Sequence, residues 1–182
     1  YHYKGEVVNT PSFELELKEE LPLDVTDSEE EISIKSGELT LVITKKNWSM
    51  TYYRNGEMIT RSAGRDLALM KTDFKGFAYN DTDAEETYMR QMLSLSVGEL
   101  VYGTGERFTP FVKNGQSIDI WNADGGTSTE QSYKNIPFFI TNKGYGVLVN
   151  HPEKVSIEVA TEMVTRTEFS VPGGYLDYFL IN

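Results

Sequence analysis

The sequence predicts an all-β fold, an antiparallel β-sandwich, and three observations lead to this prediction. Segments with an apolar residue at every second position recur along the chain, which is typical of half-buried strands. Turn signals separate these segments at intervals of about 8–12 residues, the spacing found in sandwiches and barrels. No segment of about 11 or more residues has a convincing helical period, so the strand–helix alternation of a parallel-sheet enzyme is absent.

The first half of the chain contains several expected strands and one expected hairpin turn. Apolar and acidic residues alternate over 13–17. Further strands are expected over 32–34, 39–43 and 50–53. The Asn55-Gly56 pair follows, and it tolerates the positive φ angles of a tight turn, so a hairpin is expected there.

The second half of the chain continues this pattern. Further strands are expected over 89–97, 117–121, 138–141, 147–150, 155–159, 164–169 and 176–181. Two strongly polar stretches, 19–31 and 80–86, are expected to be solvated loops. Because strand signals resume directly after each stretch, neither is a good domain boundary.

Size and composition limit the classes of function. The chain has 182 residues, 39% of them apolar, so we expect a single β-sandwich domain over 1–182. The net charge of −11 argues against a nucleic-acid partner, which needs a face of Lys and Arg. No apolar stretch approaches the roughly 20 residues needed to cross a bilayer, so no membrane partner is expected.

The cysteine and histidine counts remove further chemistry. The chain has no cysteine and two histidines, which excludes disulfides, thiolate nucleophiles and sites built from three histidines. The first six residues contain no apolar h-region, so we expect no signal peptide and a cytoplasmic location.

A glycine-rich tripeptide, Gly103-Thr104-Gly105, has the spacing of a phosphate-binding loop at first sight. The third glycine of the dinucleotide pattern would fall at Phe108, and no helical pattern follows. We therefore interpret the tripeptide as a strand-to-turn transition.

The run over 121–127 is the most informative part of the chain. Sugars offer hydroxyl pairs to carboxylates and amides, and C–H faces to aromatic rings. Glycines allow the backbone to approach a ligand closely. The candidate sugar-binding residues are Trp121, Asn122, Asp124, Gly125, Gly126 and Thr127. The alternative is a structured turn with the tryptophan in the core and the aspartate capping the turn.

Acid–base chemistry has weaker support. A glycosidase needs two carboxyl groups about 5–9 Å apart. Glu106, Asp119, Asp124 and Glu130 are near one another in sequence, which does not place any two across a bond. His151 is a candidate general base, but we favour its interpretation as an exposed histidine at a strand end.

Four sequence blocks stand out in the second half of the chain. They are Gly-Glu-Arg-Phe at 105–108, Trp-Asn and Asp-Gly-Gly-Thr within 121–127, Tyr-Lys-Asn-Ile-Pro-Phe at 133–138, and Gly-Tyr-Gly and Val-Asn-His-Pro within 144–152. Together these blocks resemble the N-terminal region of glycoside hydrolase family 31, specifically its bacterial α-xylosidase branch. The resemblance continues through 169–171 and 175–181 and is weaker over 36–55.

This resemblance implies a galactose mutarotase-like β-sandwich placed before a catalytic (β/α)₈ barrel. The family's two catalytic aspartates lie on that barrel, which takes about 250 residues, more than this whole chain. We therefore expect a fragment of a longer enzyme, with no catalytic residue of its own. The implied parent reaction is retaining hydrolysis of terminal α-linked xylose or glucose by carboxylates alone, with no metal and no cofactor.

The resemblance also implies a binding role and partners. In the family, a loop of the N-terminal domain reaches over the barrel mouth, and Asp124 occupies the matching position. The implied partners are the chain's own C-terminal barrel and an oligosaccharide, while a homo-oligomeric parent enzyme stays open. The same hypothesis predicts an exposed apolar face on this domain, where the barrel packs.

Two other classes of function stay open. A free-standing carbohydrate-binding module would need a flat platform of aromatic rings, although aromatics at strand spacing are more often cross-strand pairs. The candidate rings are Trp48, Tyr52, Tyr53 and Trp121. An aldose mutarotase needs an acid and a base across a sugar, usually His with Glu, and only His2 and His151 are present. Fold analogy is its sole support.

Overall fold

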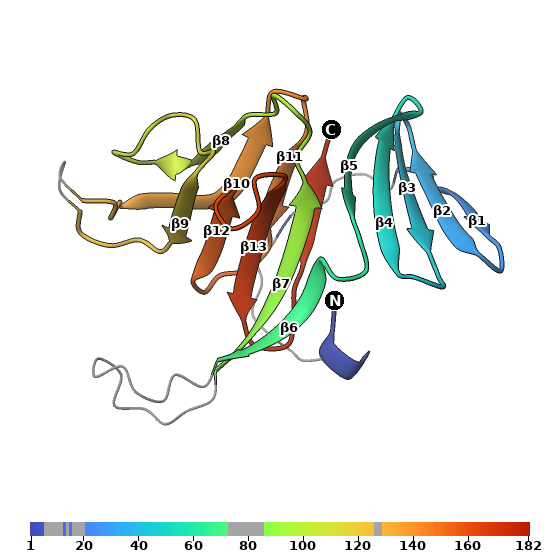
Figure 1. Cartoon of the computed structure of the whole chain (residues 1–182), viewed down its shortest axis with the longest axis horizontal. Coiled ribbons are helices and arrows are strands. Elements are labelled where there is room, and N and C mark those ends of the chain that lie inside the picture. Colours follow the sequence, from blue (N-terminus) through green and yellow to red (C-terminus); the bar gives the residue numbers. More distant parts are fainter. Residues whose placement is uncertain (6–12, 14, 16–20, 73–85, 126–128) are drawn as a thin grey trace.

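The structure is a computed structural model that describes residues 1–5, 13, 15, 21–72, 86–125 and 129–182. In this part of the chain the strands form three antiparallel sheets, and the only helical element is the short 3₁₀ turn Tyr3–Gly5. Two sheets stack as a sandwich and the third lies beside them (Figure 1). The predicted all-β, antiparallel sandwich is therefore confirmed.

The first sheet is built from consecutive strands in the order β1-β2-β3-β4-β5. Its strands are β1 (Asp24–Asp27), β2 (Glu31–Ser36), β3 (Leu39–Thr44), β4 (Ser49–Arg54) and β5 (Glu57–Ser62). Between β4 and β5, Asn55 and Gly56 have φ angles of 51° and 82°. Two successive positive φ angles are those of a type I′ turn, so the hairpin predicted there is confirmed.

The sandwich contains the remaining strands. Its four-stranded sheet has the order β14-β11-β10-β8, and its five-stranded sheet has the order β6-β7-β13-β12-β9. The bounds are β6 (Leu67–Thr72), β7 (Glu86–Ser94), β8 (Val101–Glu106), β9 (Gln116–Ile120), β10 (Lys134–Thr141), β11 (Gly146–Val149), β12 (Val155–Val159), β13 (Arg166–Pro172) and β14 (Tyr178–Ile181).

The core lies between the inner faces of these two sheets. Phe139 and Val147 from the four-stranded sheet, and Ile157 and Phe169 from the five-stranded sheet, are completely buried. Burial of each such side chain contributes about 1.5–3 kcal/mol. The same cluster continues to Met50 of the first sheet. Whether residues 1–182 form one domain, as expected, stays a prediction.

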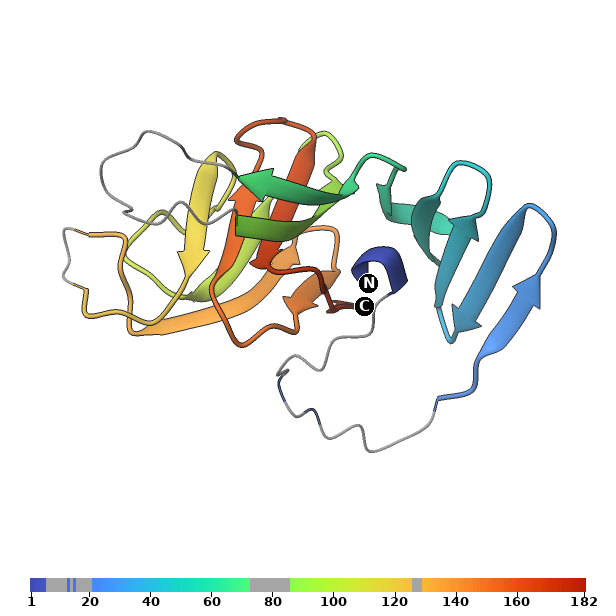
Figure 2. The ribbon, with the colours of Figure 1, turned by 90° about the horizontal axis from the view of Figure 1, so that it is seen from below.

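Side-chain hydrogen bonds from Tyr52 and Arg54 hold the first sheet against the edge of the sandwich. The hydroxyls of Tyr52 and Tyr178 lie 2.9 Å apart. The Arg54 guanidinium donates to the carbonyls of Lys143 at 2.7 Å and Gly144 at 3.2 Å. Both views place this sheet beside the sandwich and not on either layer (Figures 1 and 2).

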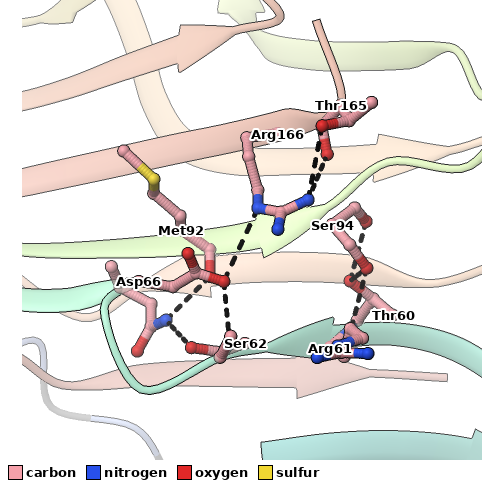
Figure 3. Close-up of polar contacts among 10 residues, drawn as sticks. Thr60, Arg61, Ser62, Asp66, Met92, Ser94, Thr165 and Arg166 are labelled. Atoms are coloured by element: carbon pink, nitrogen blue, oxygen red, sulfur yellow. Dashed lines mark hydrogen bonds and ion pairs between the residues drawn. The ribbon is translucent and has the colours of Figure 1, made fainter. Parts of the chain in front are cut away.

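A second fastening point joins β5 to β7 (Figure 3). The Thr60 hydroxyl donates to the carbonyl of Ser94 at 2.9 Å. The Asp66 carboxylate accepts from the Ala63 backbone N–H at 2.7 Å and lies 3.5 Å from Nε of Arg166. These contacts hold the turn after β5 against the five-stranded sheet.

The acidic stretch over 19–31 differs from its prediction, because β1 lies within it. All four residues of β1 are exposed and pair only with β2 at the sheet edge. Charged side chains are common on edge strands, where both faces meet water. Lys45 also contacts Asp27 at 2.5 Å, which balances part of the charge.

Two further strands, β6 and β8, were not predicted, and β5 was predicted only as the second strand of the hairpin, without bounds. The Gly103-Thr104-Gly105 tripeptide lies inside β8 and not at its end, so its interpretation as a strand-to-turn transition is wrong. All three residues have positive φ angles, and the register between β8 and β10 shifts here. A side chain at position 105 would stand 2.0 Å from the Lys134 carbonyl oxygen, so glycine is required by close approach.

Two other predictions fall partly outside the described residues. Of the expected strand over 13–17, only Phe13 and Leu15 are described, and neither lies in a strand. Of the expected loop over 80–86, only Glu86 is described, and it begins β7.

Candidate functional site

The candidate loop begins where β9 leaves the five-stranded sheet. Ile118 and Ile120 face the core and are 2% and 5% exposed. Because neighbouring residues of a strand point to opposite faces, Trp121 points outward, and its side chain is 57% exposed. The alternative with Trp121 in the core is therefore wrong.

Asn122 has a structural task in the loop. Its side-chain oxygen accepts from the backbone N–H of Asn135 at 2.8 Å. The Asn135 amide in turn donates to the carbonyls of Trp121 and Ser132, each at 2.8 Å. The Ala123 N–H also donates to Ser132. These bonds hold the loop against the start of β10.

Asp124 presents its carboxylate on the surface. The Tyr133 hydroxyl donates to Oδ1 of Asp124, and both residues are exposed. This hydrogen bond raises the pKa of the Tyr133 phenol, because the charged carboxylate favours the protonated phenol. Whether Asp124 also caps the turn stays a prediction, because residues 126–128 that follow it lie outside the described residues.

Gly125 is required by the path of the chain. A side chain at this position would stand 2.1 Å from the carbonyl oxygen of Gln131, so only glycine fits. Gly126 and Thr127, the other predicted loop residues, lie outside the described residues.

The exposed ring of Trp121 lines two surface hollows. One has a volume of about 290 Å³ and is also lined by Asn122, His151 and Glu153. The other has a volume of about 420 Å³ and carries charged walls, among them Arg107. An aromatic ring between polar walls is the arrangement that a sugar ring would need.

His151 was not recognised correctly from the sequence. Its prediction as an exposed residue is wrong, because only 4% of its surface is accessible. Nε2 lies 3.6 Å from the Glu153 carboxylate, and neither ring nitrogen has a hydrogen-bond partner among the described residues. Burial lowers the pKa of the imidazole and so favours its neutral form. The nearby Glu153 carboxylate opposes this shift only in part. Such burial has no local sequence signal.

Arg107 is a second residue whose role the sequence did not reveal. Its guanidinium donates to the carbonyl of Asp119 at 3.1 Å, to the carbonyl of Glu130 at 2.7 Å, and to the side-chain oxygen of Asn135. One side chain thus ties β9, the 129–131 segment and β10 together behind the candidate loop.

Two of the three remaining candidate carboxylates are engaged in surface ion pairs, and the third, Glu130, is exposed. Glu106 lies 3.0 Å from Lys134, and Asp119 lies 2.7 Å from Lys154. Across the described ranges, no three His, Asp or Glu side chains converge as metal ligands. Nor does this part of the chain include a helix of the length and apolarity that a bilayer span requires.

The structure thus combines a two-layer β-sandwich, a side sheet and an exposed loop that carries an aromatic ring and a carboxylate. Residues 1–158 match the family model described as the Glycosyl hydrolase 31 N-terminal galactose mutarotase-like domain. The chain belongs to this family.

The curated relatives include two α-xylosidases. Alpha-xylosidase XylQ of Lactiplantibacillus pentosus is 40% identical over 173 residues, which are 94% of this chain and 21% of that protein. An alpha-xylosidase of Emericella nidulans is 63% identical over 94 residues, which are 52% of this chain and 12% of that protein. The chain thus spans about a fifth or less of the length of these relatives.

Solved structures agree on the fold. A GH31 dextranase of Flavobacterium johnsoniae, complexed with isomaltotriose, superposes with a TM-score of 0.75 at 21% identity. The match covers 98% of this chain and 21% of that chain. At this identity the likeness concerns the fold alone.

Proposed function

We propose that this chain is the N-terminal domain of a retaining α-glycoside hydrolase that releases terminal α-linked xylose, with glucose as the second candidate sugar. The observation that carries the proposal is the 40% identity to an α-xylosidase across 94% of the chain. The relatives are much longer, so the catalytic barrel belongs to polypeptide outside residues 1–182. A cytoplasmic location is part of the proposal.

The 121–125 loop is the part of this domain that contacts the sugar. Trp121 offers an exposed ring, and Asp124 offers a carboxylate oriented by Tyr133. Asn122 and Gly125 act indirectly, because one holds the loop to β10 and the other allows its close approach to Gln131. Gly126 and Thr127 complete the proposed loop.

The isolated chain is expected to be inactive. Glu106 and Asp119 are paired with lysines, Asp124 is bonded to Tyr133, and Glu130 is exposed to water, so none of the four has the buried, apolar environment of a catalytic acid. An aryl α-xyloside assay tests this directly. Turnover by the 182-residue chain that survives stringent purification would contradict the proposal.

The binding role is tested in the longer polypeptide that contains this domain. Asp124→Ala should lower kcat/KM for the aryl α-xyloside by roughly 10-fold to 150-fold, the loss of one charged hydrogen bond of about 1.5–3 kcal/mol. Asp27→Ala is the matched control, because Asp27 is also an exposed carboxylate bonded to one side chain. Equal activity of both variants would remove Asp124 from the substrate pocket.

One observation favours the carbohydrate-binding module as second candidate, namely the exposed ring of Trp121. Tyr52, another candidate ring, is buried and bonded to Tyr178, so it cannot belong to a flat platform. Calorimetry of the 182-residue chain with xyloglucan or maltose fragments distinguishes a free-standing binding module from a domain that binds sugar only together with its catalytic barrel. Heat of binding that Trp121→Ala abolishes would favour the module.

The mutarotase alternative has less support. His151 and Glu153 line one hollow, but their side chains lie 3.6 Å apart, too close to flank a sugar ring. The other histidine, His2, pairs with Tyr175 in an isolated bridge. A polarimetric assay of glucose anomerisation with the 182-residue chain tests this alternative.

A further inference from the structure

We infer that the outward side of the four-stranded sheet is the docking surface for the polypeptide that follows Asn182. This inference rests on the proposed function, because it takes that polypeptide to be the catalytic domain. We call this surface the apolar outer face, and its members are Ile136, Phe138, Ile140, Leu148, Phe179 and Ile181.

Strand register places these side chains on one surface. Phe138 pairs with Leu148, and Leu148 pairs with Phe179, so an unbroken apolar row crosses β10, β11 and β14. Residues at every second position of a strand share a face, which puts Ile136 and Ile140 beside Phe138. Cross-strand neighbours of this kind lie about 4.5–5.5 Å apart at Cβ.

The row is extended at both ends. Ile140 pairs with Tyr102 of β8, and the ring of Tyr102 packs on Phe111 with centroids 5.1 Å apart. At the other edge, Ile181 pairs with Gly146. The face therefore reaches from β8 to β14, across every strand of the sheet.

This face is only partly shielded from water. Ile136, Ile140 and Ile181 are 51%, 45% and 46% exposed, and Phe111 is 77% exposed. Phe138, Leu148 and Phe179 are half-buried. A monomer rarely leaves a contiguous apolar surface of this kind open, because it favours association or aggregation.

Chain continuity indicates the occupant. Phe179 and Ile181 belong to β14, which is the last strand before Asn182 and forms the edge of this same sheet. Polypeptide that follows Asn182 would therefore start beside the apolar outer face. The relatives are long enough to include a further domain of the required size, because the match covers only 21% of the Lactiplantibacillus α-xylosidase and 21% of the Flavobacterium dextranase chain.

Thiol labelling tests the inference, since residues 1–182 contain no cysteine. Ile140→Cys and Ile136→Cys each place a thiol on the apolar outer face. Ser170→Cys is the matched control, because Ser170 is a partly exposed strand residue on the outward side of the five-stranded sheet and lines neither hollow beside Trp121. Each variant is made in the 182-residue chain and in the longer polypeptide, and modification is followed by mass spectrometry of the labelled peptide.

The expected result is at least tenfold slower labelling of both face variants in the longer polypeptide than in the 182-residue chain, with the labelling rate of Ser170→Cys unchanged. Equal rates in both chains would overturn the inference. Protection that already occurs in the 182-residue chain and grows with its concentration would also overturn it, in favour of a second copy as occupant.

The same samples separate this inference from the proposed function. A longer polypeptide that hydrolyses the aryl α-xyloside while Ile140→Cys stays accessible would keep the function and reject the docking surface. Protection without hydrolysis would keep the surface and reject the function.

Discussion

The two outer faces of the sandwich have opposite chemistry. The four-stranded sheet presents Phe138, Leu148 and Phe179 in one row across three strands. The equivalent row of the five-stranded sheet pairs Glu168 with Glu158 and continues to Ser117. Both sheets bury their inner faces in the same core. The difference therefore does not arise from the sandwich itself.

This difference indicates that the outward side of the five-stranded sheet is suited to contact with water, and that of the four-stranded sheet is not. A half-exposed sheet normally alternates apolar residues inward with polar residues outward, as β12 and β13 do. Strand β10 departs from that rule, since Ile136 to Ile140 are apolar on both faces. Strands that are apolar on both sides are typical of sheets covered on both sides.

The largest expected effect compares the two faces of β10. Phe139→Ala should lower the free energy of unfolding by about 3–5 kcal/mol, because Phe139 is completely buried in the core. Phe138→Ala should cost about 1 kcal/mol in the 182-residue chain, because the half-buried ring lacks a covering layer. Urea denaturation measures both values, and equal losses would mean that the outer face is already covered.

The stability of the chain should depend on pH through Glu168, on the outward side of the five-stranded sheet. Burial, with repulsion from Glu158 and Glu162 and only partial compensation by Arg90, raises the pKa of Glu168 from its ordinary 4.5 to about 7. The folded state then binds more protons than the unfolded state between these values, so stability is present at low pH and is lost as pH rises through about 7.

Glu168→Gln should remove this loss. Its free energy of unfolding should exceed that of the parent chain by about 1–2 kcal/mol at pH 8 and match it near pH 5. Glu57→Gln, at an exposed position of β5, is the control and should follow the parent chain at both pH values. Parallel stability curves for Glu168→Gln and the parent would contradict the assignment.

A double substitution on the apolar outer face should reduce the exposed apolar surface with only a small change in stability. Ile136→Thr combined with Ile140→Thr keeps β-branched residues in β10 and should change the free energy of unfolding by only about 0.5 kcal/mol per site. Binding of a hydrophobic fluorescent dye to the 182-residue chain should fall by about half. Unchanged dye binding would place the open apolar surface elsewhere.

The smallest expected effect lies at the rim of the four-stranded sheet, where His151 follows β11. Because burial lowers its pKa, the neutral imidazole contributes stability that is lost as pH falls below the ordinary histidine range. NMR titration of the 182-residue chain, with His2→Gln to assign the signals, should show His151 neutral at pH 6.5. A protonated His151 at that pH would contradict the burial.

Much of the fold was predictable because it depends on local patterns. Short apolar, β-branched runs located β3 and β12, and the Asn55-Gly56 pair located the hairpin between β4 and β5. Strand β1 was missed because it lies within the acidic stretch over 19–31, whose charge was interpreted as the mark of a solvated loop. Strand β8 was missed because the glycines at its centre are a turn signal when read without their partner strand.

The candidate loop was predictable in composition and not in geometry. Sequence reasoning selected Trp121 and Asp124, and both are exposed. It did not find Arg107 behind the loop or the burial of His151, because both depend on contacts between segments that are distant in sequence.

Phe138 and Phe139 show most simply what the sequence determined and what only the tertiary structure decided. Sequence alone determined that these identical neighbours point to opposite faces of a strand, since side chains alternate along extended backbone. Tertiary structure alone decided that Phe139 enters the core and Phe138 faces outward. The physical reason is that both faces of β10 are apolar, so burial depends on which side the second sheet covers.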